Sequence, residues 1–146
     1  MSERRETGSC FCGAIAAEMR GEPFWICYDH DDDCRRAVGG PLNVWIGYRP
    51  HQVRFMRGTP KAFSGTKGVV RTFCVDCGTS IGYRDEGLAG EFYLTVGFMD
   101  HPERFRPEAH AYWSMKLPWV VLDDGLPHVS GYSRPRDPGL RDPKDR

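Results

Sequence analysis

Hydrophobic residues alternate with polar ones in several short stretches of this chain. The clearest stretch covers residues 92–98, where every second side chain is a large hydrophobe, and weaker alternation runs through residues 14–20 and 42–48. A period of two places the apolar side chains on one face of a β-strand. Glycine and proline separate some eight such stretches, and no helix-period run reaches about 12 residues. The pattern therefore predicts a mainly β domain of short antiparallel strands.

The composition of the chain changes at about residue 132. A length of 146 residues is that of one ordinary domain. Apolar residues are spread through residues 7–131, whereas residues 132–146 consist mainly of Arg, Asp, Pro and Gly. Such a segment cannot bury enough apolar surface to offset the entropy of the chain. We expect one β domain over residues 7–131 and a disordered polar tail over residues 132–146.

Charge and hydropathy narrow the class of protein. The chain has 20 basic and 20 acidic residues, so it offers no field of one sign to a polyanion, and nucleic acid is not an expected partner. No apolar run approaches the roughly 20 residues that span a bilayer, so we expect no membrane contact. The polar N-terminus lacks the apolar segment of a secretory signal. We expect a cytoplasmic protein.

Two close pairs of cysteines are the strongest chemical signal. Six cysteines in a reducing compartment are typical of metal sites or reactive thiols rather than disulfides. Cys10 and Cys12 form a Cys-x-Cys pair and Cys74 and Cys77 a Cys-x-x-Cys pair, and a glycine follows each pair. Glycine permits a positive φ, which turns backbone N–H groups toward the sulfurs. Four thiolates can close a tetrahedral zinc site, so we predict one structural zinc that joins the two halves of the domain.

These thiols have two other interpretations. The four cysteines could simply be buried side chains, or Cys74 and Cys77 could be a thioredoxin-like redox pair. The redox pair is expected to open a helix, whereas residues 79–83 have the pattern of a strand. Structural zinc is therefore the preferred interpretation.

Taken together, the motifs resemble those of the glutathione-dependent formaldehyde-activating enzyme family. The shared features are Gly-x-Cys-x-Cys-Gly at residues 8–13, a central cluster that ends in Cys-Arg-Arg at residues 34–36, and Phe-Cys-x-x-Cys-Gly at residues 73–78. A later pattern adds Pro107, His110, Lys116 and Trp119, so the resemblance runs from about residue 8 to about residue 131. It implies an Mss4-like β fold and two zinc sites, the first on the four cysteines. It also implies condensation of formaldehyde with the thiol of glutathione to give S-hydroxymethylglutathione, formally a carbon–sulfur lyase reaction.

The chain departs from this family at the second zinc site. The family uses a central Cys-His-Cys-x-x-Cys motif, three thiolates with an open position. Alignment on Cys34 places Asp29 and Asp31 where the first two thiols stand and His30 at the family histidine. The resemblance thus implies that Asp29, Asp31 and Cys34 are the catalytic residues.

Three interpretations of this acidic cluster stay open. Asp29, Asp31 and Cys34, with His30 as a further candidate, could bind a second divalent metal, because these ligand types suit such ions. The cluster could instead form a metal-free pocket for a thiol or another small ligand, or be a solvated acidic loop. Cys27 is expected to be a small buried hydrophobe, with a fourth ligand position as the alternative.

Two classes of function follow. The first is a zinc-binding carbon–sulfur lyase that acts on a thiol adduct such as S-hydroxymethylglutathione, with a small thiol such as glutathione as the partner. The alternative is a zinc-stabilised binding module without catalysis, whose pocket holds a small molecule or peptide. Arg35, Arg36 and Arg71 are candidates for binding the carboxylates of glutathione, since a guanidinium pairs with a carboxylate through two hydrogen bonds. His110 is expected to be a core histidine.

Overall fold

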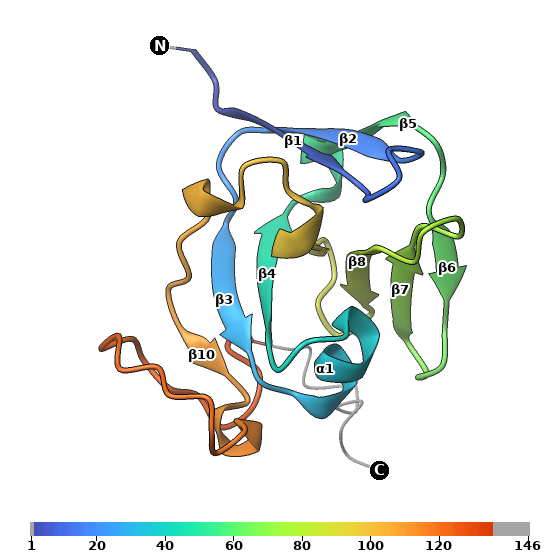
Figure 1. The fold of residues 1–146 in the computed structure, drawn as a ribbon. Coiled ribbons are helices and arrows are strands. Elements are labelled where there is room, and N and C mark those ends of the chain that lie inside the picture. The colour runs from blue at the N-terminus through green and yellow to red at the C-terminus, as the bar shows by residue number, and fades with distance from the viewer. Residues whose placement is uncertain (1, 136–146) are drawn as a thin grey trace.

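A computed structural model describes residues 2–135 and shows two β-sheets with one short α-helix (Figure 1). The smaller sheet has the order β1-β2-β5, and the larger has the order β10-β3-β4-β9-β8-β7-β6. Neighbouring strands are antiparallel except for β10, which is parallel to β3. The predicted mainly β fold is confirmed. Most of the predicted tail, residues 136–146, lies outside the described residues.

The elements have the following bounds. The small sheet contains β1 (Arg5–Ser9), β2 (Ala16–Arg20) and β5 (Val53–Arg57). The large sheet contains β3 (Trp25–Asp29), β4 (Asn43–Tyr48), β6 (Lys61–Phe63), β7 (Val69–Phe73), β8 (Ser80–Asp85), β9 (Phe92–Thr95) and β10 (His110–Ala111). The helix α1 is Asp32–Val38, and 3₁₀ turns cover Pro50–Gln52, Val96–Phe98, Pro102–Arg104 and Trp113–Met115.

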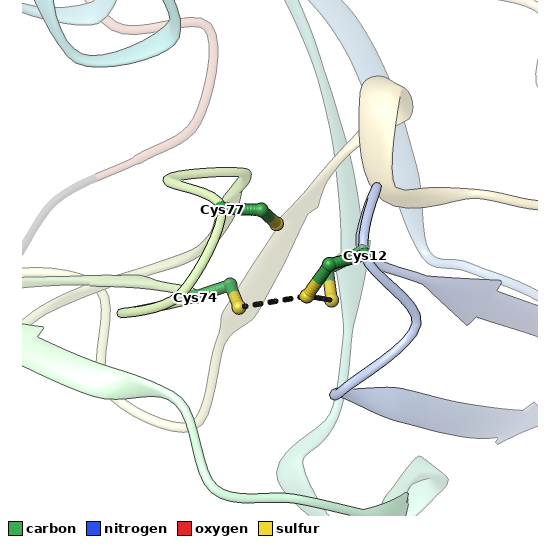
Figure 2. A group of neighbouring side chains, drawn as sticks. Cys12, Cys74 and Cys77 are labelled. Atoms are coloured by element: carbon green, nitrogen blue, oxygen red, sulfur yellow. Dashed lines mark hydrogen bonds between the residues drawn. The ribbon is translucent and has the colours of Figure 1, made fainter.

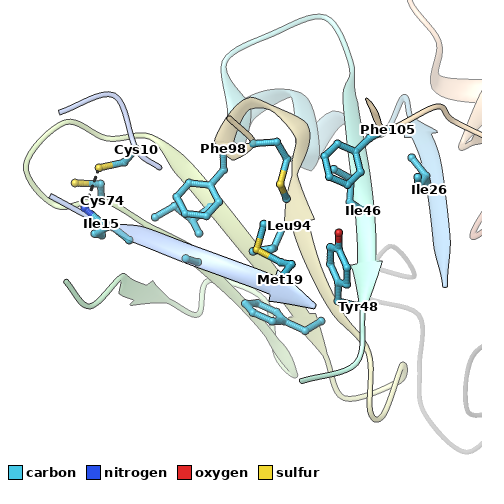
Figure 3. Close-up of a cluster of buried hydrophobic side chains, with 14 residues drawn as sticks. Cys10, Ile15, Met19, Ile26, Ile46, Tyr48, Cys74, Leu94, Phe98 and Phe105 are labelled. Carbon is cyan, nitrogen blue, oxygen red and sulfur yellow. Dashed lines mark hydrogen bonds between the residues drawn. The ribbon is translucent and has the colours of Figure 1, made fainter. Parts of the chain in front are cut away.

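The main core lies between the two sheets. Figure 3 shows Met19 of β2 beside Leu94 of β9 and Phe98, and all three side chains are fully buried. The predicted strand over residues 92–98 is therefore shorter than expected: it ends at Thr95, and the 3₁₀ turn that follows brings Phe98 into this core. Each large side chain buried here stabilises the fold by about 1.5–3 kcal/mol.

The large sheet buries its second face as well. Successive residues of β3, β4 and β9 alternate between two clusters, with Ile26, Ile46 and Leu94 in the main core and Cys27, Trp45 and Tyr93 in the other. The second cluster is rich in aromatic side chains and includes Cys34 of α1. A cleft described below is lined by residues of this face.

None of the helices within residues 2–135 has the length and apolarity of a bilayer crossing.

Candidate functional site

The two cysteine pairs sit on two similar turns. Cys10 and Cys12 lie between β1 and β2, where the N–H of Gly13 donates to the carbonyl of Cys10 at 2.9 Å. Cys74 and Cys77 lie between β7 and β8, where the N–H of Gly78 donates to the carbonyl of Cys74 at 2.8 Å. Both glycines have a positive φ, +79° and +77°, as the sequence predicted. Each turn thereby presents its two thiols on the same side.

The four sulfurs converge (Figure 2). The Sγ of Cys12 lies 3.7 Å from that of Cys10 and 3.8 Å from that of Cys74, and all four Sγ atoms lie within 4.8 Å of one another. Tetrahedral zinc with Zn–S bonds of about 2.3 Å requires sulfurs about 3.8 Å apart, whereas a disulfide requires about 2.0 Å. The donor set therefore fits a zinc ion. It also lies where the small sheet meets the large one.

Nearby donors stabilise thiolate in this group. The N–H of Ile15 donates to Cys10 Sγ at 3.2 Å, and the hydroxyl of Thr79 lies 3.3 Å from Cys77 Sγ. The hydroxyl and backbone of Thr79 lower the pKa of Cys77 to about 6. Thiolate is the form that binds metal, so this ligand needs no cationic side chain beside it to lose its proton at neutral pH.

The second cluster forms where β3 ends and α1 begins. Asp31 caps α1, its Oδ1 accepting the N–H of Cys34 at 2.6 Å, and Asp29 Oδ1 accepts the N–H of Asp31 at 3.0 Å. The Sγ of Cys34 donates to Asp29 Oδ2 at 3.4 Å. One ligand atom from each of these three residues lies within 4.8 Å of the others, and all three residues are buried. The solvated-loop interpretation of the cluster is therefore wrong.

Burying these groups together disfavours their charge. Burial and then the Asp31 carboxylate raise the pKa of Asp29 to about 7, and burial followed by both carboxylates raises the pKa of the Cys34 thiol well above its ordinary value. The guanidinium of Arg71 is the cation beside Cys34, with Nη2 3.8 Å from its Sγ. Two carboxylates and a thiol are ligands for zinc and other divalent ions, so this cluster also fits a divalent cation.

The cluster forms part of the wall of a cleft of about 470 Å³, including its open mouth. The other lining residues come from the strands β3, β4, β7, β8, β9 and β10, from the loop after β8, from the residue after β10 and from the segment after residue 131: Trp25, Cys27, Trp45, Arg71, Tyr83, Leu88, Tyr93, Ala111, Tyr112, Tyr132, Ser133 and Arg134. The first three residues of the predicted tail thus line the cleft. Tyr132 donates to Asp85, Ser133 accepts from Trp25, and Arg134 pairs with Glu91.

His30 turns away from its two aspartate neighbours. Its Nε2 lies 2.9 Å from Nδ1 of His110, and Nε2 of His110 lies 2.8 Å from Asp124 Oδ2. Both imidazoles are fully buried. Burial and then His110 lower the pKa of His30 to about 4. The two rings are therefore paired with each other, and His110 is the core histidine that the sequence predicted.

Other candidate residues have different positions. Within the described chain, the second ligand group comprises Asp29, Asp31 and Cys34, without His30 or Cys27. Cys27 is buried and lines the cleft. Arg35 donates to the carbonyls of His30 and Met115. Trp25 and Trp45, expected from the sequence to be core or pocket-wall residues, line the cleft. Its tyrosines were not predicted, because only long-range pairing brings their segments together.

The comparisons with known proteins agree with this architecture. Residues 5–115 match the family described as glutathione-dependent formaldehyde-activating enzyme. The fold is similar to that in the crystal structure of a Rhodobacter sphaeroides protein, with a TM-score of 0.54 and 20% sequence identity over 84% of this chain and 99% of the other. At that identity the likeness concerns the fold alone. A search of curated proteins finds no match.

Proposed function

The chain belongs to the glutathione-dependent formaldehyde-activating enzyme family, and from that premise we propose that it is a carbon–sulfur lyase acting on the S-hydroxymethyl adduct of a thiol, such as S-hydroxymethylglutathione. The observation that carries the proposal is the convergence of Asp29, Asp31 and Cys34 in the wall of the aromatic cleft. This reaction needs a group that transfers a proton and a site that accommodates the sulfur of the substrate thiol.

The reaction moves one proton and breaks one carbon–sulfur bond. The adduct RS–CH₂–OH loses its hydroxyl proton, the oxygen forms the carbonyl of formaldehyde, and the bonding electrons of the C–S bond go to the thiol sulfur. Asp29 Oδ2 already accepts a hydrogen bond from a sulfur, that of Cys34, so it can take the hydroxyl proton and return it to the departing thiol. Arg71, which lies beside Cys34, stabilises the negative charge that develops on the sulfur of the departing thiol.

Metals would have separate roles at the two clusters. The four cysteines would supply all four ligands of a closed structural zinc site. Asp29, Asp31 and Cys34 would hold a second divalent cation, which would supply Lewis-acid polarisation of the substrate oxygen. The aromatic walls exclude water around the reacting group in either case.

The specific observation in favour of the alternative function, a zinc-stabilised binding module, is Arg71. Its guanidinium lies next to Cys34 and over the ring of Tyr83 at 4.9 Å, so it supplies positive charge that a second metal would otherwise bring. A cleft neutralised by Arg71 alone could hold a small ligand without acting on it. The absence of any rate acceleration in the next experiment would favour this function.

The test is the rate at which the protein exchanges formaldehyde with S-hydroxymethylglutathione, measured by magnetisation-transfer NMR. Wild-type protein should accelerate the exchange, and Asp29→Asn should lower that acceleration by about 10²-fold or more, the usual contribution of an acid–base group. Asp33→Asn is the matched control, because it also removes one carboxylate charge but does so at a position in α1 that does not line the cleft. Equal loss in both variants would contradict the role of Asp29.

A further inference from the structure

The walls of the cleft have little polar capacity left for a ligand. Six of the lining residues are aromatic, and five of these donate their polar hydrogen to another protein group. Trp25 donates to Ser133 at 2.9 Å, Trp45 to Cys34 at 3.4 Å, Tyr83 and Tyr132 both to Asp85 at 3.0 Å, and Tyr93 to Glu91. Apart from the part of the Tyr83 ring that Arg71 covers, these five residues offer mainly carbon surface, which favours an apolar or aromatic ligand.

One of the two guanidinium groups of the cleft is already paired with a carboxylate, and the other contacts a neutral thiol and a ring. Arg134 Nη2 is paired with Glu91 Oε1 at 3.0 Å, and Arg71 is held against Cys34 and the Tyr83 ring. Asp29 and Asp31 add two carboxylates to the lining. A ligand with carboxylates must compete with Glu91 for Arg134, and the two aspartates offer it hydrogen-bond acceptors rather than donors.

Glutathione carries two carboxylates at neutral pH, so this cleft opposes it. We infer that the thiol of this site is a small aryl or aralkyl thiol without carboxylates, for which benzyl mercaptan is a probe. The inference rests on the proposed function, since it names the thiol half of the lyase substrate. The balanced reaction is condensation of this thiol with formaldehyde: the sulfur bonds to carbon, and the thiol proton ends on the oxygen of the new hydroxymethyl group.

Binding is tested with two thioethers that share a methylated sulfur and do not strip zinc as free thiols can. Benzyl methyl sulfide and S-methylglutathione are titrated into the full chain, and tryptophan fluorescence is recorded, because Trp25 and Trp45 line the cleft. Benzyl methyl sulfide should saturate the signal with a Kd at least about tenfold lower than that of S-methylglutathione, a difference of about 1.4 kcal/mol. Equal or tighter binding of S-methylglutathione would overturn the inference.

One variant tests the charge argument separately. Glu91→Gln should release Arg134 from its ion pair and strengthen S-methylglutathione binding several-fold, while benzyl methyl sulfide binding stays within about twofold and reports an intact cleft. The control is Glu86→Gln, which removes the same charge from an exposed position that is not part of the lining. An unchanged S-methylglutathione affinity in Glu91→Gln would contradict the role assigned to the Arg134–Glu91 pair.

Exchange rates separate this inference from the proposed function. Formaldehyde exchange is compared for the hydroxymethyl adducts of benzyl mercaptan and glutathione, and the benzyl adduct should be accelerated more. A larger acceleration of the glutathione adduct would overturn the ligand class and leave the lyase function standing. Tight binding of benzyl methyl sulfide with no acceleration of either adduct would support the ligand class and remove the lyase function.

Discussion

The sulfurs of Cys12 and Cys74 lie 3.8 Å apart, although 62 positions separate the two residues in the chain. The contact joins the turn between β1 and β2 to the turn between β7 and β8, and so the small sheet to the large one. Cys10 and Cys74 are also members of the core between the sheets (Figure 3). Metal binding at these thiols would therefore be coupled to folding.

Removal of one of these thiols should cost both metal and stability. Cys74→Ser replaces a soft ligand at a buried position by a hard hydroxyl, so we expect loss of zinc and a fall of about 4 kcal/mol or more in the free energy of unfolding. Zinc content and urea unfolding check this. Cys34→Ser, a buried cysteine of the other cluster, should keep both the zinc and the fold, and an unfolded Cys34→Ser protein would contradict this division of roles.

The second cluster is tested by metal stoichiometry. Asp29→Asn combined with Asp31→Asn should abolish binding of a second divalent ion and leave the zinc at the four cysteines. Asparagine caps a helix about as well as aspartate, so the N-terminus of α1 should remain folded. Elemental analysis of the wild type should give two metals per chain and that of the variant one. One metal in both proteins would favour the binding module.

The hydrogen bonds that link the side chains of Asp124, His110 and His30 should stabilise the fold. Asp124→Ala leaves the Nε2 of a fully buried imidazole without its carboxylate acceptor, which should lower the free energy of unfolding by about 1–3 kcal/mol. Asp123→Ala, at the neighbouring exposed position, should change it by less than about 0.5 kcal/mol. Equal effects in chemical denaturation would show that the contact with His110 contributes nothing measurable.

The same contact predicts a direction for the acid dependence of stability. Burial acts to raise the pKa of Asp124, but hydrogen bonds from the backbone N–H of Leu126 and from His110 outweigh it, and the folded-state pKa is below the ordinary value of 3.8. This group therefore stabilises the fold above its unfolded-state pKa, and that contribution disappears as the pH falls through the folded-state value. The stability difference between wild type and Asp124→Asn should shrink below about pH 4 in acid titrations of unfolding. A difference that grows on acidification would contradict the sign.

The sequence predicted the part of the site that depends on local spacing. Cys10 with Cys12 and Cys74 with Cys77 are held by short turns, and few chemistries other than zinc use four such thiols. The helix α1 also had local signals, since Asp31 is its N-cap and Gly39 ends it with a φ of +74°. The sequence prediction for residues 29–36 rested on their charge and did not include this helix.

The cleft could not be predicted in this way. Its walls come from strands that are distant in the chain, such as β3, β8 and β9, and periodicity does not reveal which strands become neighbours. Tyr132 and Arg134 belong to a segment whose composition predicts a tail. They take fixed positions because Asp85 and Glu91 bind them, which composition cannot show.

A map of anomalous scattering at the zinc edge, from crystals of the full chain, tests the central claim most directly. The account predicts a peak at about 2.3 Å from each of the Sγ atoms of Cys10, Cys12, Cys74 and Cys77. A map with the four thiols intact and no peak between them would contradict it.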